Sequence, residues 1–246
     1  MDKETKNTVE FVIACCGPAF VLGYLVFWGM LGHNIPPPNV MGMSPEQLVS
    51  DYYLKYRDSI SIGMAGCCVV ALLYLPWSCL LALMMRDDNG NLSVFSMMEL
   101  TGGALTAWVL AFCPAMWLTC AILSTSLDPT LIKLLHTCGW FIYDVTFMIT
   151  TVQLTGLGLY TVLNKRQTIF PAWAGWCAIA VGIIFLPLVL IPFVDKGPFM
   201  LPGTWNFYIV FGTWLFGFFS PYSFFMLKEL SARRREFMPD ATALGH

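Results

Sequence analysis

The stretch SVFSMMELTGGALTAWVLAFCPAMWLTCAIL, residues 93–123, decides the fold class of this chain. Glu99 is its only Asp, Glu, Lys or Arg. A helix rises about 1.5 Å per residue, so about 20 consecutive apolar residues cross the roughly 30 Å hydrocarbon core of a bilayer. The stretch is therefore predicted to be a membrane-spanning helix.

Five further stretches have the same character. The predicted spans are residues 9–32, 59–85, 93–123, 137–163, 170–193 and 204–228. Over 246 residues, 57% are hydrophobic and 11% charged, against about 25% charged in soluble domains. Backbone groups in lipid must pair within their own segment, which requires helices. We predict an all-α integral membrane protein, one domain over residues 1–246, with six transmembrane helices and a cytoplasmic tail over residues 229–246.

The distribution of Lys and Arg predicts that both termini are cytoplasmic. If the N-terminus is inside, the inner side holds Lys3, Lys6, Arg86, Lys165, Arg166, Lys228, Arg233, Arg234 and Arg235. The outer side then holds Lys55, Arg57, Lys133 and Lys196. An excess of basic residues marks cytoplasmic loops. The net charge of −2, without a basic stripe that carries interleaved aromatics, argues against a nucleic-acid partner.

Two carboxyl groups inside predicted spans are the main candidates for chemistry. Glu99 lies near the cytoplasmic end of the third span, and Asp144 lies near the exterior end of the fourth. Burying an ionisable group in hydrocarbon costs several kcal/mol, so such groups often mark a site. Their different depths predict that the two carboxyls are not direct partners.

Polar residues gather around Asp144 at helical spacing. His136, Trp140 and Tyr143 share its face, Thr151 continues it, and Gln153 falls near the depth of Glu99. Such a face can form a polar track for a substrate or a proton. It can equally consist of hydrogen bonds between helices that fix their packing. The sequence leaves both interpretations open.

The sequence predicts no metal site and no cofactor. The chain has three histidines, and it lacks H-E-x-x-H, G-x-S-x-G and Walker-type motifs. All nine cysteines lie inside predicted spans and none forms C-x-x-C, so they are interpreted as small core residues.

Small residues four positions apart predict close contacts between helices. One row lies in the third span and a similar row in the fifth: Gly103, Ala107 and Ala111, then Ala174, Ala178 and Gly182. Small side chains let helix backbones approach in lipid, where hydrophobic association is absent. Both rows are predicted to face protein.

The segment GHNIPPPNVMGMSPEQLVSDYYLKYRDSI, residues 32–60, is the most polar insertion between spans. Ser44, Pro45 and Gln47 form a helix start with a capping box. Over the predicted exterior helix 45–58, the tyrosines 52, 53 and 56 belong to one apolar-aromatic stripe. The stripe is expected to rest either on lipid, as an anchor, or on the end of the bundle, as a lid.

The motif order resembles a group of uncharacterised bacterial polytopic membrane proteins of about six helices, of the domain-of-unknown-function type. The resemblance rests on the PPP loop at 36–38, MSPEQLVSDYYLKYRDSISIGM at 43–64 and FPAWAGW at 170–176. It implies the bacterial inner membrane, and it carries no functional residues over to this chain.

Three functions fit these observations. The first is binding or transport of a small or lipophilic molecule in a cavity lined by the face of Asp144, with Glu99 as a second polar point. The second is a membrane-embedded enzyme that acts on a lipid-like substrate through a buried carboxyl. The third is a structural subunit that docks a membrane-protein partner or a second copy. Membrane lipids are expected partners in each case.

Overall fold

The computed structural model describes residues 2–87, 89–164 and 168–235, and these residues form helices without any β-strand. Six helical segments are long and apolar enough to cross a membrane. In chain order they are α1 (Lys3–Tyr24) with η1 (Leu25–Leu31); α3 (Arg57–Ala71) with α4 (Tyr74–Leu83); α5 (Val94–Leu123); α6 (Pro129–Val145) with α7 (Met148–Leu163); α8 (Ala172–Phe185) with η3 (Leu186–Phe193); and η4 (Thr204–Val210), α9 (Phe211–Thr213), η5 (Trp214–Phe219) and α10 (Ser220–Arg235).

The all-α class is confirmed, and each predicted span corresponds to a helical segment long and apolar enough to cross a membrane; the first, fourth and sixth are longer than hydropathy indicates. The fourth segment begins at Pro129, because the Asp128 carboxylate caps it by accepting a 2.8 Å hydrogen bond from the Thr130 N–H. The sixth runs to Arg235, so residues 229–235 of the predicted tail are helical, and residues 236–246 lie outside the described residues. Hydropathy marks where apolar side chains end, whereas a helix continues until its backbone is capped.

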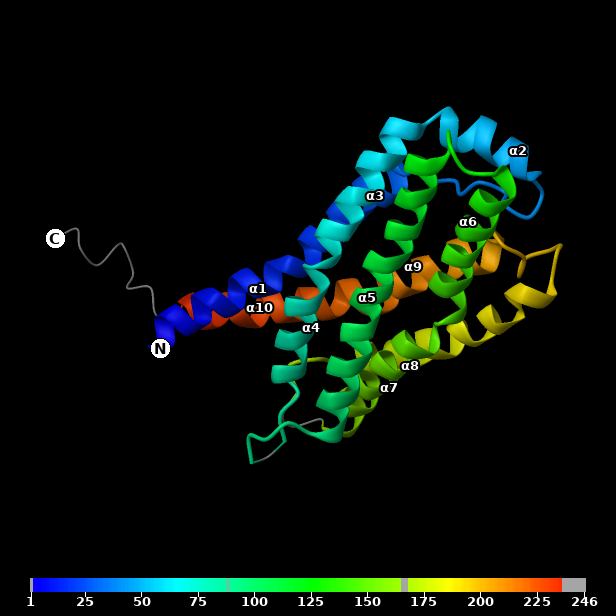
Figure 1. Ribbon diagram of the computed structural model, residues 1–246. Helices are drawn as coiled ribbons and strands as arrows, with labels where there is room; N and C mark the ends of the chain where they lie inside the picture. The colour runs from blue at the N-terminus through cyan, green and yellow to red at the C-terminus, as the bar shows by residue number, and fades with distance from the viewer. Residues whose placement is uncertain (1, 88, 165–167, 236–246) are drawn as a thin grey trace.

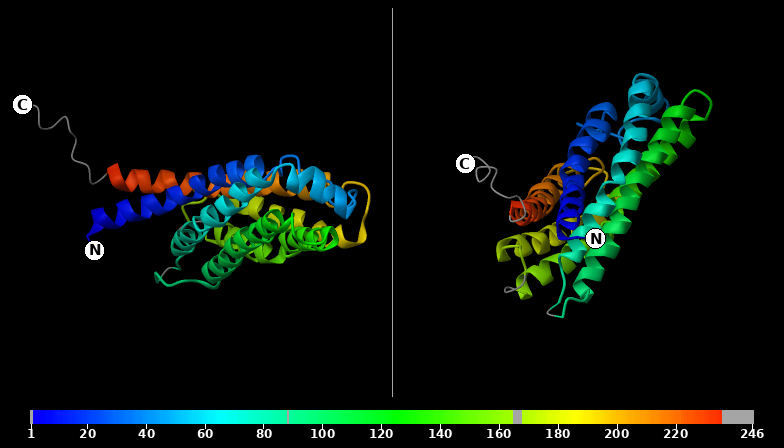
Figure 2. Two further views of the ribbon diagram at one scale, coloured as in Figure 1. Left: turned by 45° about the horizontal axis from the view of Figure 1, so that its top comes forward. Right: turned by 90° about the vertical axis from the view of Figure 1, so that its left-hand side faces the viewer.

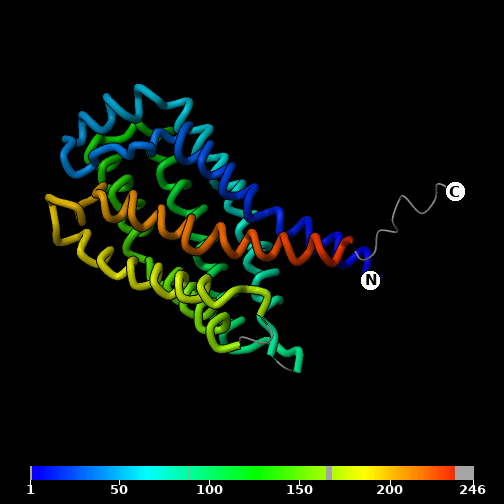
Figure 3. The backbone as a smooth tube through the Cα atoms, turned by 180° about the vertical axis from the view of Figure 1, so that it is seen from behind, coloured from blue at the N-terminus to red at the C-terminus, as the bar shows by residue number. Residues whose placement is uncertain are grey.

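Helices α1 and α10 form an antiparallel pair that lies side by side near the chain ends, and beyond it the first and last segments diverge (Figures 1 and 3). The N-terminus and the end of α10 meet at one end of this pair, where Arg233 Nη1 lies 3.9 Å from Glu10 Oε2. The other four segments pack beside it, with α5 in contact with α3, α4, α6 and α7 (Figure 2). The segment of α2 (Pro45–Gln47) and η2 (Leu48–Leu54) lies across one end of the bundle, against α6 (Figure 1).

Two of the segments are interrupted, and the second interruption shapes the site described below. The second segment breaks at Leu72–Leu73, because Pro76 lacks an N–H and its ring clashes with the carbonyl four residues earlier. The fourth breaks at Thr146–Phe147, which is a position without a proline. There the Thr146 Oγ1 donates to the Ile142 carbonyl oxygen at 2.6 Å, a pattern that bends helices.

The small-residue rows lie between helices, and a further close backbone contact lies outside them. Gly103, Ala107, Ala174, Ala178 and Gly182 are buried, and Ala111 is half-buried. A Cβ on Gly103 would meet the Ser78 hydroxyl of α4 at 1.9 Å. A contact outside both rows joins α7 to α8, where a Cβ on Gly158 would lie 2.8 Å from the Gly175 carbonyl oxygen.

The outward surface of the bundle is apolar. In the most hydropathic stretch of each of the six segments, only 28–44% of the residues are buried. Large side chains such as Leu72, Ile183 and Phe216 are therefore exposed around the bundle. Such a continuous apolar surface is the one that lipid covers, and it indicates a multi-pass membrane protein.

Candidate functional site

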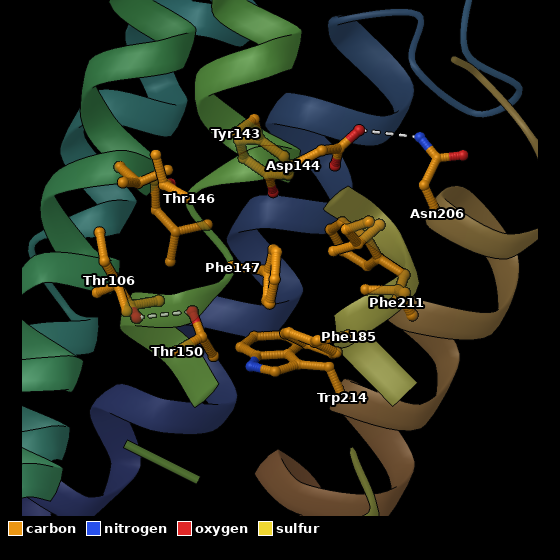
Figure 4. Close-up of a pocket in the computed structure, with 15 residues that line it drawn as sticks. Thr106, Tyr143, Asp144, Thr146, Phe147, Thr150, Phe185, Asn206, Phe211 and Trp214 are labelled. Atoms are coloured by element: carbon orange, nitrogen blue, oxygen red, sulfur yellow. Dashed lines mark hydrogen bonds between the residues drawn. The ribbon is translucent and has the colours of Figure 1, made fainter. Parts of the chain in front are cut away.

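A cavity of about 80 Å³ lies beside the break between α6 and α7. Helix α5 and the segments around Phe185 and Asn206 close its other sides (Figure 4). Its polar lining consists of Thr106, Tyr143, Asp144, Thr146, Thr150 and Asn206. Its apolar lining includes Val109, Leu110, Phe147, Ile149, Phe185, Leu188, Val210, Phe211 and Trp214. A single water needs about 10–15 Å³, so the cavity has room for several waters or a small functional group.

Asp144 and Asn206 form the polar end of the cavity. The Asn206 Nδ2 donates to Asp144 Oδ2 at 2.9 Å, and both side chains are buried. The Asn206 Oδ1 accepts a 2.6 Å hydrogen bond from the Gly203 N–H, which orients the amide so that its donor faces Asp144. Among the described residues, Asp144 Oδ1 has no hydrogen-bond partner. One carboxyl oxygen is thus held in place, and the other remains available to a ligand.

The opposite side of the cavity carries a hydroxyl pair and flat aromatic walls. The Thr106 and Thr150 hydroxyls are 2.9 Å apart, across the contact between α5 and α7 (Figure 4). The Tyr143 and Phe211 rings are stacked with centroids 6.4 Å apart, and Trp214 borders the same space. The arrangement suits a molecule that has one polar group and an apolar body.

His136 lies outside this cavity, on the part of α6 that contacts the α2–η2 segment. The Trp140 Nε1–H donates to His136 Nε2 at 3.1 Å, so that nitrogen is the acceptor of a neutral ring. The Nδ1 therefore carries the proton and faces the Tyr53 hydroxyl at 2.5 Å. His136 and Asp144 share a helix, but the structure places them in different surroundings.

The tyrosine stripe rests on the bundle. Tyr52 and Tyr53 are buried, Tyr56 is half-buried and stacks on His33, and the Tyr52 hydroxyl donates to the Gly32 carbonyl oxygen at 2.7 Å. Burial raises the pKa of the Tyr53 hydroxyl well above its usual value, so this group is neutral. The helix ends at Leu54 and not at residue 58, because the backbone turns at Tyr56 before α3.

Glu99 belongs to a separate buried network. Its Oε1 accepts hydrogen bonds from Ser78 Oγ at 2.9 Å and from Gln153 Nε2 at 3.0 Å. The Gln153 Oε1 in turn accepts from the Tyr74 hydroxyl at 2.8 Å. Glu99 does not line the cavity, so the two carboxyls do not share one site. Thr151 also lies apart, with its hydroxyl buried and without a hydrogen bond in the described part of the chain.

Asn206 is one of several site residues that sequence reasoning missed, together with Thr106, Thr146 and Thr150. Its signal is an amide in the predicted sixth span, a polar group that needs a partner in an apolar setting. That signal does not name Asp144 as the partner, because the two residues are 62 positions apart. Comparison of the chain with protein-family models, curated proteins and solved structures finds no match.

Proposed function

We propose that this chain is a membrane protein that binds a small or lipophilic molecule in the Asp144 cavity and moves or senses it there. The observation that carries the proposal is a buried carboxyl whose Oδ2 is held by Asn206 while its Oδ1 has no partner in the described chain. An oxygen of Asp144 that borders the cavity and has no partner in the described chain can accept a hydrogen bond from a ligand that donates one.

The lining defines the class of ligand. Asp144 favours a hydroxyl, an ammonium or another hydrogen-bond donor, and the rings of Tyr143, Phe211 and Trp214 favour an apolar body. A volume of about 80 Å³ accepts the polar end of such a molecule. The remainder of a longer molecule extends between the helices toward lipid.

The proposed setting is a bacterial inner membrane with both termini in the cytoplasm. The uneven distribution of Lys and Arg supports this orientation. It places the α2–η2 segment on the exterior, where its tyrosines act as a lid over the end of the bundle.

The test is binding of a short brominated alkyl alcohol, and of the corresponding amine, to the protein in lipid nanodiscs. Bromine quenches nearby tryptophan fluorescence, and Trp214 borders the cavity. We expect the quenching to saturate with ligand concentration. In Trp214→Phe, the part of the quenched fluorescence that comes from Trp214 should be lost. The apparent Kd should rise severalfold in Asp144→Asn, since a hydrogen bond contributes about 0.5–1.5 kcal/mol net.

Glu99→Gln is the matched control, because it removes a buried carboxyl that does not line the cavity. Its Kd should equal that of the wild type. Quenching that does not saturate, or an equal Kd in Asp144→Asn and the wild type, would show that the ligand does not bind in the Asp144 cavity.

A further inference from the structure

The two oxygens of the Glu99 carboxyl group differ in their hydrogen bonding. It lies between α4, α5 and α7, fully buried, with both hydrogen-bond donors on Oε1. Its Oε2 is buried and has no hydrogen-bond partner. The two oxygens of one side chain therefore have opposite environments.

This asymmetry matches a carboxylic acid better than a carboxylate. An acid has one carbonyl oxygen that can accept two hydrogen bonds, as Oε1 does here, and one hydroxyl oxygen. A carboxylate spreads its charge over both oxygens, and the half on Oε2 would be buried without any donor. An unpaired charge in an apolar interior costs far more than an unpaired hydroxyl, so such a group takes up a proton.

Within residues 2–87, 89–164 and 168–235, no cation pairs with a charge at this position. None of the ion pairs within the described residues includes Glu99. The titratable groups that face it are Tyr74 and Cys79, both on α4, and α7 contributes only the neutral amide of Gln153.

The neighbouring helices pack closely beside Glu99, and Oε2 itself is buried. A Cβ on Gly102 would lie 2.7 Å from the Gln153 backbone nitrogen, and a Cβ on Gly103 would lie 1.9 Å from the Ser78 hydroxyl. Helices α4, α5 and α7 thus pack closely about one turn along α5 from Glu99.

We propose that Glu99 is a proton-binding site, occupied in this arrangement of α4, α5 and α7. The proton resides on Oε2, and the site releases it only when the three helices separate enough for Oε2 to gain a donor or water. Thr106 lies two turns further along α5 and pairs with Thr150 of α7, so this separation also changes one wall of the cavity. That consequence rests on the proposed function, whereas the proton site does not.

The test is infrared spectroscopy of the full-length protein in nanodiscs at neutral pH, with and without ¹³C-labelled glutamate. A protonated carboxyl has a carbonyl band that is separate from carboxylate bands. We expect such a band in the wild type, displaced by the label and absent in Glu99→Gln. A protonated aspartate would give a band that the glutamate label does not move.

Two results would overturn the proposal. One is a labelled wild type that shows only carboxylate bands for glutamate. The other is a displaced carbonyl band that persists in Glu99→Gln, which would assign the proton to another glutamate. The label measurement needs no variant, so a wild type without any protonated glutamate contradicts the proposal even where Glu99→Gln does not fold. Neither result depends on whether the cavity binds a ligand.

Discussion

At the scale of single residues, hydrogen bonds between buried polar side chains connect the segments of the bundle. Asn206 illustrates this best, because its two amide atoms serve different partners. Its oxygen caps the backbone at Gly203, and its nitrogen reaches Asp144 on another segment. In an apolar interior each of these groups would be costly to leave unpaired.

Asn206→Leu is expected to destabilise the protein by about 1–3 kcal/mol, because it leaves Asp144 Oδ2 and the Gly203 N–H without partners. The cost should be smaller in a chain that already carries Asp144→Leu, since only the Gly203 N–H then loses its partner. Unfolding in detergent, measured for the wild type, both single variants and the double variant, gives the coupling directly. Additive effects would show that the hydrogen bond contributes nothing to stability.

At the scale of elements, the contact between the α2–η2 segment and α6 includes one buried hydrogen-bonded pair, Tyr53 and His136. Sequence patterns predicted the helix start and its stripe, because capping and periodicity are local. They could not predict that Tyr53 meets His136, because those residues are 83 positions apart.

Tyr53→Phe is expected to loosen this segment, because it removes the hydroxyl that pairs with His136 Nδ1. A lost buried partner costs about 1–3 kcal/mol, so amide hydrogen exchange over residues 45–54 should accelerate roughly tenfold or more. Tyr208→Phe is the control, since Tyr208 is 59% exposed and should leave exchange in this segment unchanged. Equal exchange in all three proteins would mean that apolar packing alone holds the segment.

A second prediction at this scale concerns α7 and α8. Gly158→Ala should destabilise the bundle by about 1–3 kcal/mol, because the new methyl group would lie 2.8 Å from the Gly175 carbonyl oxygen. Gly212→Ala, also in a helix, meets no atom within 4 Å and should be neutral or slightly stabilising. Thermal unfolding of both variants makes the comparison. Similar midpoints would show that α7 and α8 can move apart without cost.

At the scale of the whole molecule, the sequence predicts features that depend on one segment, and it does not predict contacts between segments. The six segments were predictable because the preference for lipid adds up residue by residue within a segment. The break beside Pro76 is also a local effect, because a proline interrupts the helix in which it lies. The break at Thr146–Phe147 and the pairing of Asp144 with Asn206 depend on which helix faces meet. Those contacts are properties of the assembled bundle, and local patterns do not contain them.

The proposed orientation, with both termini in the cytoplasm, is inferred from the charge distribution of the whole chain and can be tested by labelling. Glu46 and Asn91 are both exposed and lie on opposite sides of the second segment. With both termini in the cytoplasm, a membrane-impermeant maleimide should label Glu46→Cys in intact bacterial cells. It should label Asn91→Cys only after the membrane is permeabilised.

The wild-type chain is the reference, because all nine of its cysteines lie in or beside the apolar segments, away from both introduced positions. The reverse labelling pattern would place the α2–η2 segment in the cytoplasm and move Lys55, Arg57, Lys133 and Lys196 inside with it. That arrangement would oppose the rule that basic residues stay in the cytoplasm, and it would then require an interaction stronger than the charge bias to hold it.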